Sequence, residues 1–171
     1  MDILQEIGKM YYYMRDYKNS FTYYSKFIEM KEAQQLSIYD SEYGKISIVY
    51  DKMGMKPEAE NYFNAYFEYA KEDESLYKDL SLAAYYAYID STEQSLEYLK
   101  LFTEEDNYHY WTLLFLEIDP MVDNLQEIPE FKRLVEKIKM KFWKNHDEIQ
   151  VSLEKKGLIW ICNSSKITIP E

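Results

Sequence analysis

The side chains best suited to catalysis are few in this chain of 171 residues and lie far apart in it. His109 and His146 are the only imidazoles, and Cys162 is the only thiol. A thiol activated by a histidine is a nucleophile, but no spacing brings these three residues together, and no Asp or Asn is placed to orient a histidine. Lone His and Cys residues usually have structural or surface roles, so we predict no catalytic residues.

Metal and cofactor sites have as little support. No predicted helix carries His or Cys ligands at i, i+3 or i+4, and no glycine-rich phosphate-binding loop occurs. Acidic clusters at 72–74 and 104–106 fall at predicted helix N-termini, where negative charge complements the helix dipole. We therefore expect neither metal nor cofactor, and a protein that is not an enzyme.

Composition favours long helices. Only four glycines and four prolines are present, too few for many short strands and their turns, whereas aromatic residues make up 18% of the chain. Nineteen of them are tyrosines, which suit positions half-buried between helices because one end of the ring is polar.

Charge and cysteine content restrict the partners. The net charge of −11 repels nucleic acid backbones and anionic membranes, so we expect neither as a direct partner. One cysteine excludes an internal disulfide framework and is typical of a reducing compartment. The N-terminus, MDILQEIGKMYYYM, shows no sign of a signal peptide or a transmembrane span. We expect a cytoplasmic protein.

Apolar residues recur at three- and four-residue spacing through the first hundred residues, which predicts amphipathic helices in pairs. The pair around Gly54 has the clearest turn, with Pro57 suited to the first turn of the next helix. The predicted helices are 2–14, 17–31, 37–53, 57–71, 76–89 and 92–103.

The three predicted pairs repeat one pattern of large, small, aromatic and small residues, offset by 39 and then 36 residues. Small residues would let the two helices approach closely, and the aromatic residue would fill the adjacent gap. A generic helical bundle with chance spacing is the alternative. The matching sets are Ile7, Gly8, Tyr11, Ser20 and Tyr24; Ile46, Ser47, Tyr50, Ala59 and Phe63; and Leu82, Ala83, Tyr86, Ser95 and Leu99.

These positions, over residues 1–104, resemble tetratricopeptide repeats. The resemblance implies an all-α, right-handed superhelix of about three helical hairpins, followed by additional C-terminal helices. Phe27, Tyr66 and Phe102 depart from the family pattern, because they stand where it prefers a small residue.

Residues 105–157 are expected to form C-terminal capping helices packed on the array. One helix is predicted over 104–118, ended by Asp119–Pro120, and a longer one from Pro129 to about Lys156, stopped by Gly157. The tail, 158–171, is β-prone or disordered. Trp111, Asp119–Pro120 and Pro129–Phe131 resemble the closing segment of tetratricopeptide modules in bacterial signalling proteins.

The predicted long helix carries a basic strip over residues 130–144, with six basic residues against two acidic ones. A solvated helix face is the simpler interpretation. The other is a docking strip for the acidic repeats of a second copy, which would form a homodimer.

In tetratricopeptide arrays the first helix of each hairpin lines a concave surface, so the resemblance implies a peptide-binding groove here. Tyrosines and lysines can hold an extended peptide by stacking and by carboxylate contacts, although simple packing between helices would also explain the tyrosines. The outward positions of the first hairpin are Gln5, Lys9, Tyr12 and Tyr13. Those of the second hairpin are Ile48, Asp51 and Lys52, and those of the third are Tyr77 and Tyr88.

Two functional hypotheses follow. The first is a non-enzymatic scaffold that binds a protein or peptide in the groove of its helical repeats. The second is the sensory or regulatory half of a bacterial transcription regulator or nucleotide cyclase, which would act through self-association while its effector domain lies outside this chain.

Overall fold

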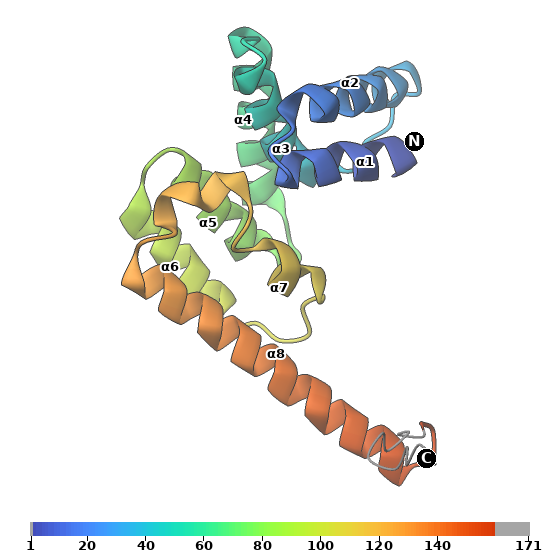
Figure 1. Ribbon diagram of the computed structural model, residues 1–171, viewed down its shortest axis with the longest axis vertical. Coiled ribbons are helices and arrows are strands. Elements are labelled where there is room, and N and C mark those ends of the chain that lie inside the picture. The colour runs from blue at the N-terminus through green and yellow to red at the C-terminus, as the bar shows by residue number, and fades with distance from the viewer. Residues whose placement is uncertain (1, 160–171) are drawn as a thin grey trace, which may run out of the picture.

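The computed structural model describes residues 2–159, and every regular element in that range is a helix (Figure 1). The all-α fold of helices packed in adjacent pairs is confirmed. The predictions for Cys162 and for most of the tail concern residues 160–171, which lie outside the described part. The α-helices are α1 (Asp2–Tyr13), α2 (Tyr17–Ala33), α3 (Tyr43–Lys52), α4 (Lys56–Glu72), α5 (Lys78–Tyr88), α6 (Thr92–Phe102), α7 (Trp111–Phe115) and α8 (Pro129–Lys155), and the 3-10 helices are η1 (Asp40–Glu42) and η2 (Pro120–Leu125).

The two helices of each hairpin meet at one pair of small residues, and a serine hydroxyl spans the contact. In each case the serine donates to the carbonyl oxygen of the small residue twelve positions away on the other helix. The serine stands on the second helix in the first and third hairpins and on the first helix in the second hairpin. The three bonds are Ser20 to Gly8 (2.8 Å), Ser47 to Ala59 (2.8 Å) and Ser95 to Ala83 (2.7 Å).

The same repeat offsets govern the turns and the neighbouring aromatic rings. Arg15, Gly54 and Asp90 each have positive φ, and in each turn the following residue's amide bonds back across it. Tyrosine rings also pair across each hairpin, again at a separation of twelve residues. These pairs are Tyr11–Tyr23 (5.7 Å between centroids), Tyr50–Tyr62 (5.1 Å) and Tyr86–Tyr98 (5.4 Å).

Gly8 shows why one of the small residues has no side chain. A Cβ atom at Gly8 would lie only 3.0–3.3 Å from the ring of Tyr24. That ring has no room to move, because Tyr24 is fully buried and its hydroxyl donates to Glu42 at 2.6 Å. The close approach of α1 and α2 therefore depends on glycine at this position.

The three residues that depart from the family pattern are all buried, and each lies on the second helix of its hairpin and packs against the segment that follows that hairpin. Phe27 packs edge-on against Tyr39 in the connection to η1, and Phe102 packs against Tyr108 beyond α6. The Tyr66 hydroxyl donates to the carbonyl of Ser81 at 3.0 Å. Their bulk fills the longer joints of this chain.

Two predicted helices are shorter in the structure. The third helix begins at Tyr43 rather than Ser37, because Tyr39 has a left-handed backbone and η1 intervenes. The predicted helix over 104–118 is wrong except for the short α7. There the carbonyls of Thr103 and Glu104 accept hydrogen bonds from the Lys141 ammonium (3.2 and 2.7 Å), not from a following helical turn.

The C-terminal part packs on the hairpins and ties the first to the third. Asp123 of η2 pairs with Arg15 in the first turn at 2.5 Å. Its neighbour Asn124 donates to the Ala87 carbonyl (2.7 Å) and to Asp90 in the third turn (2.8 Å). Both buried apolar clusters contain residues from both parts of the chain, so η2 and the start of α8 complete the hydrophobic core.

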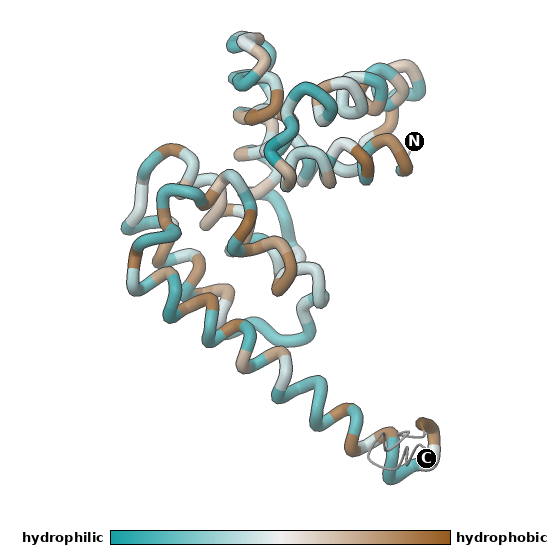
Figure 2. The backbone as a smooth tube through the Cα atoms, in the orientation of Figure 1, coloured by the Kyte–Doolittle hydropathy of each residue, from teal (hydrophilic) through white to brown (hydrophobic). Residues whose placement is uncertain are grey.

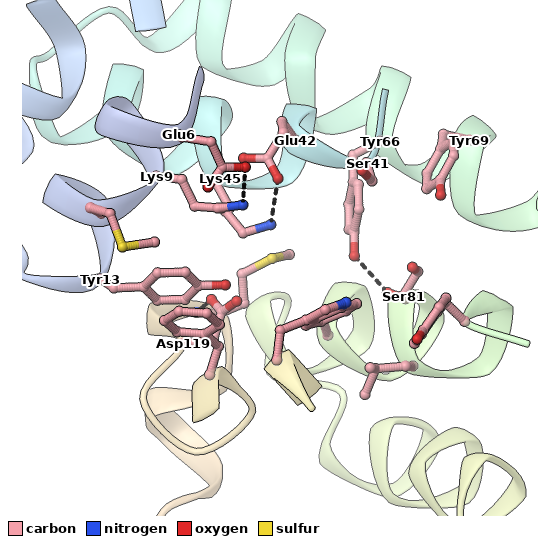
Figure 3. A pocket seen from close by; sticks show the side chains of 17 residues that line it. Glu6, Lys9, Tyr13, Ser41, Glu42, Lys45, Tyr66, Tyr69, Ser81 and Asp119 are labelled. Atoms are coloured by element: carbon pink, nitrogen blue, oxygen red, sulfur yellow. Dashed lines mark hydrogen bonds and ion pairs between the residues drawn. The ribbon is translucent and has the colours of Figure 1, made fainter. Parts of the chain in front are cut away.

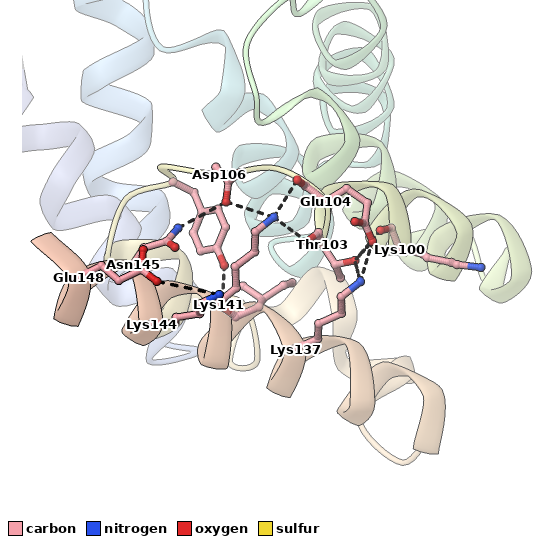
Figure 4. A network of polar contacts seen from close by, with 11 residues as sticks. Lys100, Thr103, Glu104, Asp106, Lys137, Lys141, Lys144, Asn145 and Glu148 are labelled. Atoms are coloured by element: carbon pink, nitrogen blue, oxygen red, sulfur yellow. Dashed lines mark hydrogen bonds and ion pairs between the residues drawn. The ribbon is translucent and has the colours of Figure 1, made fainter.

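The basic strip of α8 forms ion pairs with carboxylates of the same chain, and the docking interpretation stays a prediction. Each of its six cations lies within 4 Å of a carboxylate of the same chain. Two of these carboxylates, Glu104 and Asp106, belong to the loop after α6 (Figure 4). Together with the Lys139–Glu117 pair, they fasten α8 to the body. The pairs are Lys132–Glu127, Arg133–Glu130, Lys137–Glu104, Lys139–Glu117, Lys141–Asp106 and Lys144–Glu148.

None of the helices in residues 2–159 combines the length and the apolar character needed to cross a bilayer.

Replacing Gly8 by Ala should destabilise the protein, although alanine is the better helix former. Overpacking against Tyr24 costs about 1–3 kcal/mol, whereas alanine returns about 1 kcal/mol of helix propensity. We expect a net loss of roughly 1 kcal/mol in the unfolding free energy, measured by urea titration. A gain in stability would show that Tyr24 yields and that the glycine is not required.

Candidate binding pocket on the inner face of the hairpins

A pocket of about 450 Å³ lies where the first helices of the three hairpins face the C-terminal part (Figure 3). Side chains of α1, of η1 with α3 and of α5 form its walls, with two tyrosines from α4. Residues of α7 and η2, together with Asp119, close it. Five separate stretches of sequence thus converge on one cavity.

Aromatic rings make up much of the pocket wall. Tyr13 stacks on Phe115 of α7 with centroids 4.3 Å apart, and Tyr77 lies 5.1 Å from the indole of Trp111. Tyr66 is held by its bond to the Ser81 carbonyl. Trp111 keeps 43% of its surface exposed. The lining of the pocket is therefore held in place and largely apolar, and the Trp111 side chain remains accessible to a ligand.

Two ion pairs stand side by side on one wall (Figure 3). Lys9 pairs with Glu6 at 2.7 Å, and Lys45 pairs with Glu42 at 3.3 Å. Burial by itself would raise the pKa of Glu42, but Lys45 and the Tyr24 hydroxyl outweigh it, so the pKa is lowered. Burial would lower the pKa of Lys45, but Glu42 reverses this and raises it. Both groups are therefore charged at neutral pH.

Asp119 differs from Glu42 in its surroundings. Its Oδ1 accepts hydrogen bonds from the Tyr12 hydroxyl at 2.5 Å and from the Met121 amide at 2.9 Å. Within residues 2–159, no Lys, Arg or His lies within ion-pair distance of it. Burial raises the pKa of this carboxyl more than Lys45 and the hydrogen bonds lower it. Asp119 thus anchors the C-terminal segment in the groove while remaining easier to protonate than an exposed aspartate.

Three of the predicted groove residues, Lys9, Tyr13 and Tyr77, line the pocket. Two others do not face outward as expected. Tyr12 is fully buried beneath Asp119, and Ile48 is 1% exposed in the cluster that includes Met121. Gln5 is buried as well. The reason is that α7 and η2 cover this part of the inner face, which the repeat pattern alone leaves open.

The remaining three predicted residues lie away from the pocket. Asp51 pairs with Lys56 across the second turn at 3.2 Å, and Lys52 is exposed at the end of α3. Tyr88 packs against Phe63 of α4 with centroids 5.0 Å apart. The simple packing interpretation holds for this tyrosine.

The repeat offsets miss much of the pocket because the three first helices do not contribute the same set of positions to its lining. Equivalent positions are shared only at Glu6, Lys45 and Ser81, which follow the offsets of 39 and 36. That register could have identified Lys45. The contributions of Trp111, Phe115 and Asp119 carry no such signal, because they come from outside the repeats.

The histidines are not brought together. His109 stacks beside Tyr77 with centroids 6.1 Å apart, and His146 is exposed on α8 beside Trp143. Among residues 2–159, no cluster of three His, Cys, Asp or Glu side chains is arranged to hold a metal ion.

Asp119→Asn and Glu42→Gln should change the pH dependence of stability in opposite directions. The pKa of Asp119 is raised above 3.8, so its contribution to stability grows as pH falls from the raised value to 3.8. The pKa of Glu42 is lowered below 4.5, so its contribution is present above 4.5 and is lost as pH falls through the lowered value.

Urea unfolding between about pH 3 and pH 7 measures both effects. The wild type should gain stability relative to Asp119→Asn as pH falls and lose it relative to Glu42→Gln. Slopes of the same sign would contradict the assignment of the two carboxylates.

Comparison with protein-family models, with curated proteins and with solved structures found no match for this chain. The likeness to tetratricopeptide repeats accordingly rests on the repeated positions themselves, and it stays a prediction.

Proposed function

We propose that this protein is a non-enzymatic binding module that holds a segment of another protein, or a peptide, in the pocket on the inner face of its helical hairpins. The observation that carries the proposal is the cavity of about 450 Å³ lined by aromatic rings and two lysines. Its volume falls in the range of sites that take ligands of side-chain to drug size.

The pocket is well ordered before any ligand arrives. Tyr13 is held by Phe115, Tyr66 by Ser81, and Lys45 by Glu42. A preordered site pays little conformational entropy when it binds, so more of the contact energy appears as affinity.

The state of the charged groups favours binding over catalysis. Glu6, Glu42 and Asp119 each already make a structural hydrogen bond or ion pair, as do Lys9 and Lys45. These structural contacts account for all five charged groups without a catalytic role.

The chain's own C-terminal segment indicates which chemistry the inner face accepts. An aromatic ring, Phe115, stacks on Tyr13, and a carboxylate, Asp119, takes the Tyr12 hydroxyl. The open remainder of the pocket presents further rings and the two lysine–glutamate pairs. We therefore expect a bound segment to insert an apolar or aromatic side chain into the pocket. We expect its backbone N–H and C=O groups to contact the two lysine–glutamate pairs.

Trp111→Ala should weaken peptide binding at least tenfold, since an exposed tryptophan at the centre of a site typically contributes about 2 kcal/mol or more. Candidate peptides come from an array of random synthetic 12-residue peptides probed with the whole chain, and their affinities are measured by fluorescence polarisation.

Trp143→Ala is the matched control. Trp143 is 46% exposed, close to the 43% of Trp111, but lies on α8 outside the pocket. Its replacement should leave peptide affinity unchanged. Equal losses in both variants, or no effect of Trp111→Ala, would contradict the proposed site, as would an array on which no peptide binds.

A second candidate function is the regulatory half of a bacterial transcription regulator or nucleotide cyclase. The observation that favours it is α8, whose C-terminal half extends from the body (Figure 1) in the manner expected of a helix that joins other chains. A DNA-binding or cyclase domain adjoining this chain in the native reading frame would support the candidate, and its absence would remove it.

A further inference from the structure

The C-terminal half of α8 leaves the body of the protein. All the buried residues of this helix lie between Phe131 and Ile138. Beyond Phe142 the helix continues for more than three turns away from the hairpins (Figure 1), and apolar positions recur to its end (Figure 2). Ile149 is 56% exposed there. A helix surrounded by water is normally polar on every side, so these exposed apolar residues need an explanation.

Charge is confined to one side of this segment. At 3.6 residues per turn, Phe142, His146, Ile149 and Leu153 form a continuous stripe, which we call the distal stripe. His146 and Ile149 are exposed, whereas Leu153 is half-buried and Phe142 is half-buried against Tyr108 and Tyr110. Four uncharged residues flank it, Trp143 and Gln150 on one edge and Asn145 and Ser152 on the other. The charged side chains of residues 142–155 all fall on the opposite side of the helix, and they are Lys144, Asp147, Glu148, Glu154 and Lys155.

We propose that the distal stripe is the contact surface for a second copy of this chain, with the two α8 helices packed antiparallel. The stripe matches itself in that arrangement, because its spacing of four, three and four residues reads the same in both directions. Phe142 would lie opposite Leu153 of the second copy, and His146 opposite Ile149. A two-fold interface requires this kind of self-complementarity.

Charge also favours a second copy at this place rather than elsewhere. The whole chain carries −11, so two copies repel each other over most of their surfaces. Residues 142–155 hold two basic and three acidic side chains, so this segment carries a net charge of only −1 to oppose the approach. The uncharged flanks place no like charges against each other.

The interface is small. One stripe of about three turns per chain buries less than the roughly 1,200 Å² of the smallest stable interfaces, although the nearby Asp106–Asn107 loop, which borders Ile149 in a shallow depression, adds some area. We therefore expect a reversible dimer with a dissociation constant in the micromolar range. Apolar contacts hold the dimer together, and salt screens the repulsion between the two negatively charged chains. Added salt should therefore leave the dimer intact or tighten it.

The test is sedimentation equilibrium of the full chain from roughly 1 μM to 1 mM, at low and high salt. The wild type should dimerise at both salt concentrations, and Ile149→Asp should raise the dissociation constant at least tenfold. Val151→Asp is the matched control. Val151 is also β-branched, 46% exposed and on the same helix, but it lies among the charged residues, so its replacement should leave the dimer unchanged.

Four results would overturn the proposal. They are a wild type that stays monomeric, a dimer that Ile149→Asp does not weaken, equal weakening by Val151→Asp, and a dimer that dissociates in salt. A monomeric wild type would mean that the stripe is covered within the chain or by a different protein. Circular dichroism should show unchanged helix content in both variants, since neither replaced side chain is buried.

Discussion

The close contact between the two helices of each hairpin sets the geometry on which the rest of this structure depends. It is made at a pair of small residues, and a buried serine hydroxyl bonds to the carbonyl opposite, as in the contact of Ser20 with Gly8. A larger residue at either position would push the helices apart. Because the contact recurs three times at the same internal spacing, the three hairpins stack with their first helices on a common inner face.

That inner face is only partly covered. The segment from α7 to η2 crosses this face. Phe115 stacks on Tyr13, and Asp119 accepts a hydrogen bond from the Tyr12 hydroxyl. Residues of η2 also connect the first turn to the third. What the segment leaves uncovered is the pocket. The rigidity of the pocket follows from these contacts, since the groups that line the pocket also hold the C-terminal part in place.

Residue spacing was enough to predict the fold but not the covering of the groove. The offsets of 39 and 36 residues correctly placed Ser20, Ser47 and Ser95 at the helix crossings, since packing inside a hairpin is local in sequence. The resemblance to tetratricopeptide repeats led us to place Tyr12 and Ile48 in an open groove, whereas the structure buries both. That burial comes from Asp119 and Met121, more than 70 residues further along the chain, and no periodicity within the repeats reports on such a distant contact. The same holds for Lys137 and Lys141 of α8, whose partners belong to the loop after α6.

Chemical-shift mapping by NMR tests the central claim, that binding occurs in the inner pocket. The indole N–H groups of Trp111 and Trp143 report on the pocket and on α8, respectively. On titration with a peptide selected from the array, the account predicts that the largest changes fall on the Trp111 indole and on the amides of Tyr13, Lys45 and Tyr77. Changes centred on α2 and α6, with the Trp111 indole unmoved, would contradict it.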